Sequence, residues 1–154
     1  ELSKPNLGQY SPTEVIQAGT VKEVYDLMSQ PDFDPTKQII LQNTDVDVSH
    51  SAEFAEFEFH PGQIRVRAKS SGRSLLLLPV NYSNCWSIVD GGSDVLKLHR
   101  GNLVHLTIEF EGELDVLLER SFNVWSMSCK EQDAEDLWDL EHEYFFTDKG
   151  LWRQ

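Results

Sequence analysis

Two polar segments of the chain contain residue types that are suited to binding a sugar. Tyr82, Asn84 and Trp86 alternate along one segment, and Arg100 and Asn102 lie in the other. An aromatic face can stack on a sugar ring while amide and guanidinium groups bond to its hydroxyls. Because Trp86 begins an apolar alternation, we assign it to the core. The sequence therefore predicts a ligand-binding site made of Tyr82, Asn84, Arg100 and Asn102 on loops of a rigid scaffold.

Common catalytic and metal-binding motifs are missing from the sequence. There is no nucleophile elbow, phosphate-binding loop, dinucleotide fingerprint or H-E-x-x-H motif. His99 and His105 can approach each other across a turn, but no third ligand accompanies them, so we expect surface or half-buried histidines. With 26 acidic residues, carboxylates will meet by chance and do not identify a catalytic pair. We predict no catalytic residue, no metal and no cofactor, and we expect the chain not to be an enzyme.

The two cysteines leave two alternatives open. Cys85 and Cys129 form neither a CxxC motif nor a zinc-binding spacing, so they form a disulfide or remain free. The neighbours of Cys85 include no histidine that would lower the pKa of its thiol, and we expect it to be buried and inert.

The charge of the chain limits its partners. Lys and Arg number 13 against 26 Asp and Glu, which gives a formal charge of -13. Such a field repels phosphate backbones, so nucleic-acid binding is not expected. No apolar run approaches the length of about 18 residues that a membrane-spanning helix needs.

The elements that must position the candidate site are mostly strands. Thr20 and Glu23 form a capping box that predicts a short helix over residues 21–29, and residues 38–42 have the composition of a strand. Residues 53–69 alternate with a period of two around a Pro-Gly turn, which predicts a hairpin with its glutamates and arginines on the solvent face. Further hairpins are predicted around residues 90–92 and 111–113, and residues 74–80 should form a central strand.

About eight short strands predict a mainly β fold, an antiparallel two-layer β-sandwich of jelly-roll type, with a closed barrel as the alternative. We divide the chain into an extended linker or first strand (1–20), the β domain with its leading helix (21–127) and an acidic amphipathic tail (128–154). If helical, the tail is a solvated helix face or a docking segment that uses Trp138 and Trp152.

Residues 75–91, LLLLPVNYSNCWSIVDG, also resemble a known family. A strand followed by a Tyr-x-x-Gly-Trp and Val-Asp-Gly signature is similar to the C-terminal extracytoplasmic domain of bacterial YfhO-type membrane proteins. The residues that carry this resemblance are Tyr82, Trp86, Val89, Asp90 and Gly91, and Cys85 stands where the family usually has glycine.

The resemblance extends over about residues 15–122, with Arg100 and Asn102 in positions similar to an Arg and an Asn of the family. It implies an extracytoplasmic β domain, tethered to the membrane by the rest of a polytopic, glycosyltransferase-like protein. The implied role is to position or recognise a glycan, a lipid-linked sugar or a partner, without chemistry of its own. The alternatives are a separate carbohydrate-binding module and an interaction domain that acts through its acidic tail.

Overall fold

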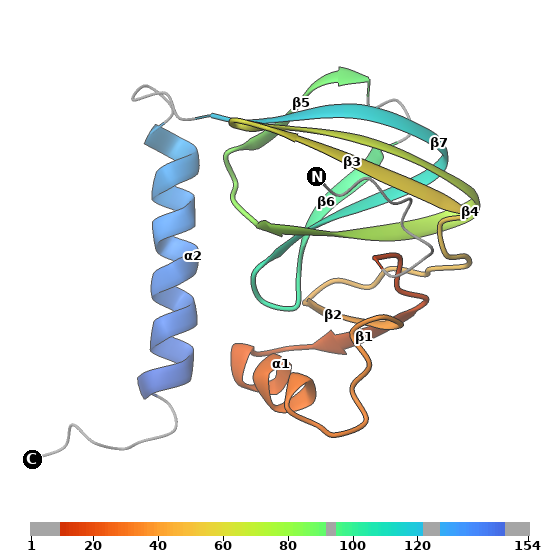
Figure 1. Ribbon diagram of the computed structural model, residues 1–154. Coiled ribbons are helices and arrows are strands. Elements are labelled where there is room, and N and C mark those ends of the chain that lie inside the picture. Colours follow the sequence, from red (N-terminus) through yellow and green to blue (C-terminus); the bar gives the residue numbers. More distant parts are fainter. Residues whose placement is uncertain (1–9, 92–94, 122–126, 147–154) are drawn as a thin grey trace, which may run out of the picture.

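The computed structural model describes residues 10–91, 95–121 and 127–146 (Figure 1). It confirms a mainly β fold. It also confirms the short early helix, and it shows that the described part of the acidic tail, whose conformation the sequence left open, is helical. The elements are β1 (Glu14–Ala18), α1 (Val21–Met28), β2 (Gln38–Gln42), β3 (Phe54–His60), β4 (Gln63–Asn81), β5 (Trp86–Gly91), β6 (Val95–Gly101), β7 (His105–Arg120) and α2 (Met127–Phe146).

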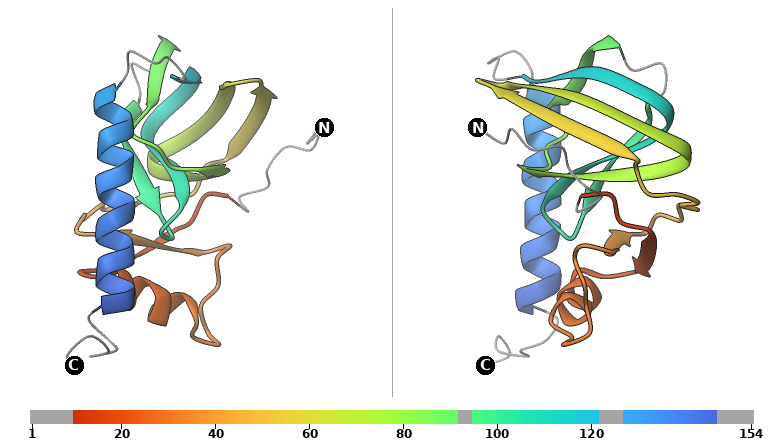
Figure 2. Two further views of the ribbon diagram at one scale, coloured as in Figure 1. Left: turned by 90° about the vertical axis from the view of Figure 1, so that its left-hand side faces the viewer. Right: turned by 45° about the vertical axis from the view of Figure 1, so that its right-hand side comes forward.

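All seven strands are hydrogen-bonded into one mixed sheet, so the two separate layers of a sandwich or jelly roll are not confirmed. The strand order is β1-β2-β6-β7-β4-β3, and β5 also pairs with β7. Strands β1 and β2 are parallel and are joined by α1, as a parallel pair requires a crossover connection. The sheet curves strongly, and α2 stands along one side of it and reaches α1 (Figure 2).

Helix α1 begins where the capping box predicts. The backbone N–H of Glu23 donates to Oγ1 of Thr20 at 3.1 Å, and the Glu23 carboxylate accepts from the N–H of Gly19 at 2.7 Å. Val24 is buried against Ala18 of β1. The two bonds satisfy donors that a helix start leaves unpaired, while the packing of Val24 fixes the helix on the parallel strand pair.

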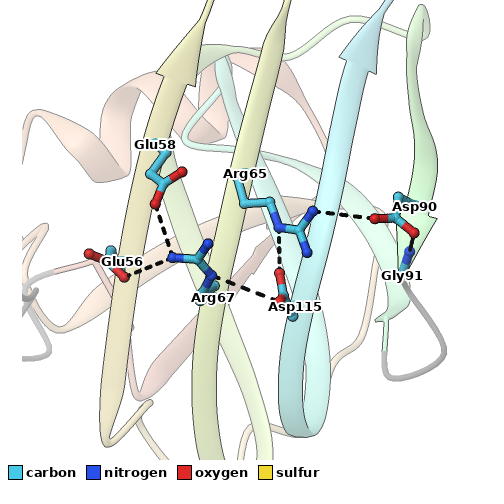
Figure 3. A network of polar contacts seen from close by, with 7 residues as sticks. All are labelled: Glu56, Glu58, Arg65, Arg67, Asp90, Gly91 and Asp115. Carbon is cyan, nitrogen blue, oxygen red and sulfur yellow. Dashed lines mark hydrogen bonds and ion pairs between the residues drawn. The ribbon is translucent and has the colours of Figure 1, made fainter.

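The β3–β4 hairpin has its glutamates and arginines on one face, as predicted, and the structure gives the register that the sequence left open. Glu56 lies opposite Arg67 and Glu58 opposite Arg65, and Gly62 takes a positive φ of 75° in the turn. The Arg67 guanidinium bonds to both glutamates, at 3.4 Å and 2.9 Å (Figure 3). Opposite charges thus face each other in solvent while the alternate residues Ala55, Phe57, Ile64, Val66 and Ala68 are buried.

The charged face continues across the neighbouring strands. Arg65 turns to β7 and β5, where it donates to Asp115 at 2.6 Å and to Asp90 at 3.3 Å (Figure 3). The hydrogen bond from Arg65 holds the pKa of the exposed Asp115 carboxyl below its ordinary value. The two arginines of β4 are therefore paired with acidic side chains of β3, β7 and β5 on one face of the sheet.

The hairpin predicted around residues 90–92 is wrong. Strands β5 and β6 pair with successive parts of the same edge of β7 and not with each other. Gly91 has a φ of 71°, and a Cβ on it would lie 2.0 Å from the backbone oxygen of Asp115. Gly91 is therefore needed for a close approach to the β7 backbone beside a bulge, and not for the hairpin turn that Asp90-Gly91 suggested in the sequence.

The hairpin predicted around residues 111–113 is also wrong, because β7 passes through this segment as one continuous strand. Gly112 has a φ of 86°, and the register with β4 shifts between Lys69 and Arg73. Residues 74–80 are in a strand, as predicted, but this strand is the second half of the longer β4. The irregularity bends the long β4–β7 pair, which explains the curvature of the sheet.

The main core lies on the face of the sheet opposite the charged face. Ile64, Val66 and Ala68 of β4 alternate with the charged positions, and Leu76 and Leu78 further along the strand belong to the same core. Apolar residues of β7 that pair with β4 also belong to it. Trp86 packs partly buried against this core, as assigned from the sequence. Five residues of this core, Val66, Leu76, Leu78, Ile108 and Val116, have a relative exposure of 0%.

Candidate ligand-binding cleft beside the C-terminal helix

A disulfide attaches α2 to the loop that contains the candidate residues. Cys85 lies in the loop between β4 and β5, and it is bonded to Cys129 in the first turn of α2. The sequence left this bond open. It excludes a nucleophilic role for Cys85, since a sulfur in a disulfide has no thiolate to offer. It also places the first half of α2 directly over Tyr82, Ser83 and Asn84.

Asp133 of α2 accepts three hydrogen bonds from this loop. The buried Ser83 hydroxyl donates to one carboxylate oxygen at 2.5 Å, and the backbone N–H and side-chain amide of Asn84 donate to the other at 2.7 Å and 2.9 Å. Burial raises the pKa of Asp133, but the bonds from Ser83 and Asn84 outweigh it and hold the pKa below the ordinary value of 3.8. The carboxylate of Asp133 is therefore a charged anchor for the helix.

Asp136, one helical turn further along α2, joins the remaining candidates. Its carboxylate accepts from Arg100 and, at 2.9 Å, from the Asn84 amide. The Arg100 guanidinium lies 4.9 Å from the centre of the Tyr82 ring, a cation–π contact. The Tyr82 hydroxyl donates to the Asn84 amide oxygen at 3.1 Å, and burial raises the pKa of Tyr82. Three of the four predicted residues thus form one cluster with Asp136.

Asn102 is not part of this cluster. It is buried in the turn between β6 and β7, where it has a φ of 47°. Its side-chain oxygen accepts from the N–H of Ile40 at 2.8 Å, and its own N–H donates to the Ile40 oxygen at 3.0 Å. The side chain of Asn102 thereby completes the junction of β2 with the β6–β7 turn, which is a structural role.

A cleft of about 310 Å³ opens beside the cluster. We call it the α2 cleft, because Asp136 of α2 forms part of its wall. The other walls come from the end of β2 and from β6, and the lining is mostly polar. The lining residues are Leu41, Gln42, Asn43, Thr44, Tyr82, Lys97, Leu98, His99, Arg100 and Asp136.

Sequence reasoning missed most of this lining. Gln42, Asn43 and Thr44 form an ordinary strand end in the sequence, and Lys97 lies in a strand with no distinctive motif. Asp136 was one acidic residue among many. The signal that pointed to its location was the cysteine pair, since a bond from Cys129 to Cys85 brings the helix to the Tyr82 loop.

The polar groups of the α2 cleft are suited to binding a ligand. His99 does not face His105: its Nε2 lies 2.7 Å from the Glu109 carboxylate in a buried pair, and the register places it opposite Thr107. Within residues 10–91, 95–121 and the described part of α2, no three His, Cys, Asp or Glu side chains are grouped to hold a metal ion. The α2 cleft instead offers amides, a hydroxyl, an ammonium and a phenol, which are donors and acceptors for a polar ligand.

Comparison of the chain with family models, with curated proteins and with solved structures finds no match. No helix in the described part of the chain combines the length and apolar character needed to cross a bilayer.

Proposed function

We propose that this chain is a non-catalytic accessory domain that binds a hydroxyl-rich ligand, a glycan, in the α2 cleft. The observation that carries the proposal is the cleft itself, a concave polar site of about 310 Å³ beside three of the residues expected to bind ligand. This volume is at the lower end of the range of about 300–1,000 Å³ for small-molecule sites, and it suits one or two sugar rings.

The lining supports a glycan better than an apolar ligand. The amides of Gln42 and Asn43 can donate and accept, as sugar hydroxyls do. The Thr44 hydroxyl donates to the Gln42 backbone oxygen at 3.2 Å and can accept a bond from a ligand hydroxyl. The Tyr82 ring lies between the core and Arg100, so we expect it to contact the ligand through its edge and hydroxyl and not by stacking. All these groups are held on strand ends and on a disulfide-bonded loop, which limits the entropy lost on binding.

We further propose that the domain is extracytoplasmic and is tethered to the membrane by the rest of a glycosyltransferase-like protein. The Cys85–Cys129 disulfide supports an oxidising compartment, because disulfides are rare in the cytosol. The resemblance of residues 75–91 to the YfhO-type domains supports the membrane-bound parent. Thiol alkylation in the native cells, with and without prior reduction, tests the location: labelling only after reduction is the expected result.

An interaction domain that acts through α2 is the second candidate. Trp138 has a relative exposure of 61% on an acidic helix, which is typical of a side chain that enters a partner's groove. A partner bound there would lose affinity with Trp138→Ala, whereas the α2 cleft would keep its sugars.

Titration of the isotopically labelled protein with a panel of oligosaccharides, followed by NMR, tests the glycan proposal. We expect shifts in the amide signals of residues 42–44 and 97–100. Thr44→Val should weaken binding, because it removes the hydroxyl but keeps the shape. The matched control is Thr36→Val, which lies outside the cleft and bonds to Asp34. Binding that Thr44→Val leaves unchanged would place the site elsewhere, and turnover of a glycoside by the pure protein would contradict the non-catalytic proposal.

A further inference from the structure

We propose that the ligand of the α2 cleft carries a carboxylate, as a uronic-acid sugar does, and that Lys97 binds this group. The inference rests on the proposed function and names the class of sugar. It concerns the one wall of the cleft that β6 provides, where Lys97 and Arg100 both lie.

The two cations of this wall differ in their partners. Arg100 is neutralised by Asp136, to which it donates a hydrogen bond. Lys97 has no acidic group within ion-pair distance among the described residues. Three other exposed lysines each have such a group at 3.4 Å or less, and these pairs are Lys22–Asp26, Lys37–Asp34 and Lys69–Glu113.

An unpaired lysine is unusual in so acidic a chain. The 26 acidic side chains outnumber the 13 basic ones twofold, so an exposed ammonium group usually has a carboxylate nearby. Lys97 instead faces a concave polar space that no side chain fills. An ammonium donates and cannot accept, so its best partner in a ligand is an anion.

The remaining lining restricts the anion to one with hydroxyl groups. Gln42, Asn43 and Thr44 offer neutral donors and acceptors, which suit hydroxyls better than a second charge. Arg100 and Asp136 neutralise each other, so Lys97 is left to pair with one anionic group of a ligand. A sugar ring with a single carboxylate fits this lining.

Calorimetric titration with two probes that differ at one carbon tests the inference. Methyl β-glucuronide carries a carboxylate where methyl β-glucoside carries a hydroxymethyl group. We expect the glucuronide to bind about fivefold more tightly at low salt, as an exposed ion pair of this kind allows. The difference should shrink as salt is added, because the pair is solvent-screened.

Lys97→Gln should remove the preference for the glucuronide and leave the glucoside affinity unchanged. Lys69→Gln is the matched control, because it removes the same charge from a lysine outside the cleft, and it should retain the preference. Equal binding of both probes by the native protein would overturn the acidic-ligand inference and leave the glycan proposal standing. Binding of neither probe would contradict both, and a preference that Lys97→Gln retains would show that another group binds the carboxylate.

Discussion

Removal of the Cys85–Cys129 disulfide should lower the stability of the whole domain and not only release α2. The bond joins residues 44 positions apart. In the chain-entropy description a closed loop of this length restricts the unfolded state by about 13 cal/mol/K, which corresponds to about 4 kcal/mol at 25 °C. For a domain of this size each kcal/mol shifts the melting temperature by about 2–4 °C, so the expected decrease is about 8–16 °C.

The variant to measure is Cys85→Ser with Cys129→Ser, compared with the oxidised native protein by scanning calorimetry. Thermal circular dichroism in the helical and aromatic regions follows α2 and the sheet separately. The double variant Asp133→Asn with Asp136→Asn is the control, because it removes the carboxylate contacts and keeps the disulfide. A melting temperature within about 2 °C of the native value, with loss of the helical signal alone, would refute the reasoning, since α2 would then fold independently of the sheet.

Three further outcomes are expected. Gly91→Ala should lower the free energy of unfolding, measured by chemical denaturation, by more than about 3 kcal/mol, because the φ of Gly91 is positive and a Cβ there would meet a backbone oxygen. Gly112→Ala should lower it by only about 1–2 kcal/mol, because the space around Gly112 is open. Asn102→Ala should cost about 2–4 kcal/mol, since it leaves a buried N–H unpaired and keeps a left-handed backbone; a cost under 1 kcal/mol would contradict its structural role. Burial raises the pKa of Asp133, but its hydrogen bonds lower the pKa by more, so the net shift is downward. The charge of Asp133 therefore stabilises the fold above about pH 4, and this stabilisation is lost as the pH falls through the pKa of the folded state. Asp133→Asn should flatten that part of the pH profile, and an unchanged profile would exclude the anchor.

Local signals were sufficient where the interacting groups are close in the sequence. The capping box of Thr20 and Glu23 located α1, and the matched charges of Glu56 and Arg67 predicted the first hairpin and its solvent face. In both cases the interacting residues are at most 11 positions apart, so one short segment of sequence contains both partners and the contact can be predicted from it.

Local signals failed where a glycine has more than one structural use. Gly91 and Gly112 have positive φ values, as a hairpin turn also requires, and the sequence could not distinguish a turn from a bulge. The distinction depends on which strand pairs alongside, and that partner is remote. The candidate site shows the same limit, since Ser83 and Asp133 are 50 residues apart and only the folded sheet and helix bring them together.

The pairing of β4 with β7 also sets the order in which this chain can fold. Gln63 pairs with Glu119 and Asn81 with His105, so the central strands of the sheet come from distant parts of the chain. The entropy of closing a long loop is lost before such contacts form and stabilise the structure. For this reason β-rich domains fold slowly compared with helical bundles. During synthesis the first part of β4 lacks its partner strand until residues near Glu119 are available. Cys129 follows β7 in the chain, so the Cys85–Cys129 disulfide cannot form before all seven described strands have been synthesised.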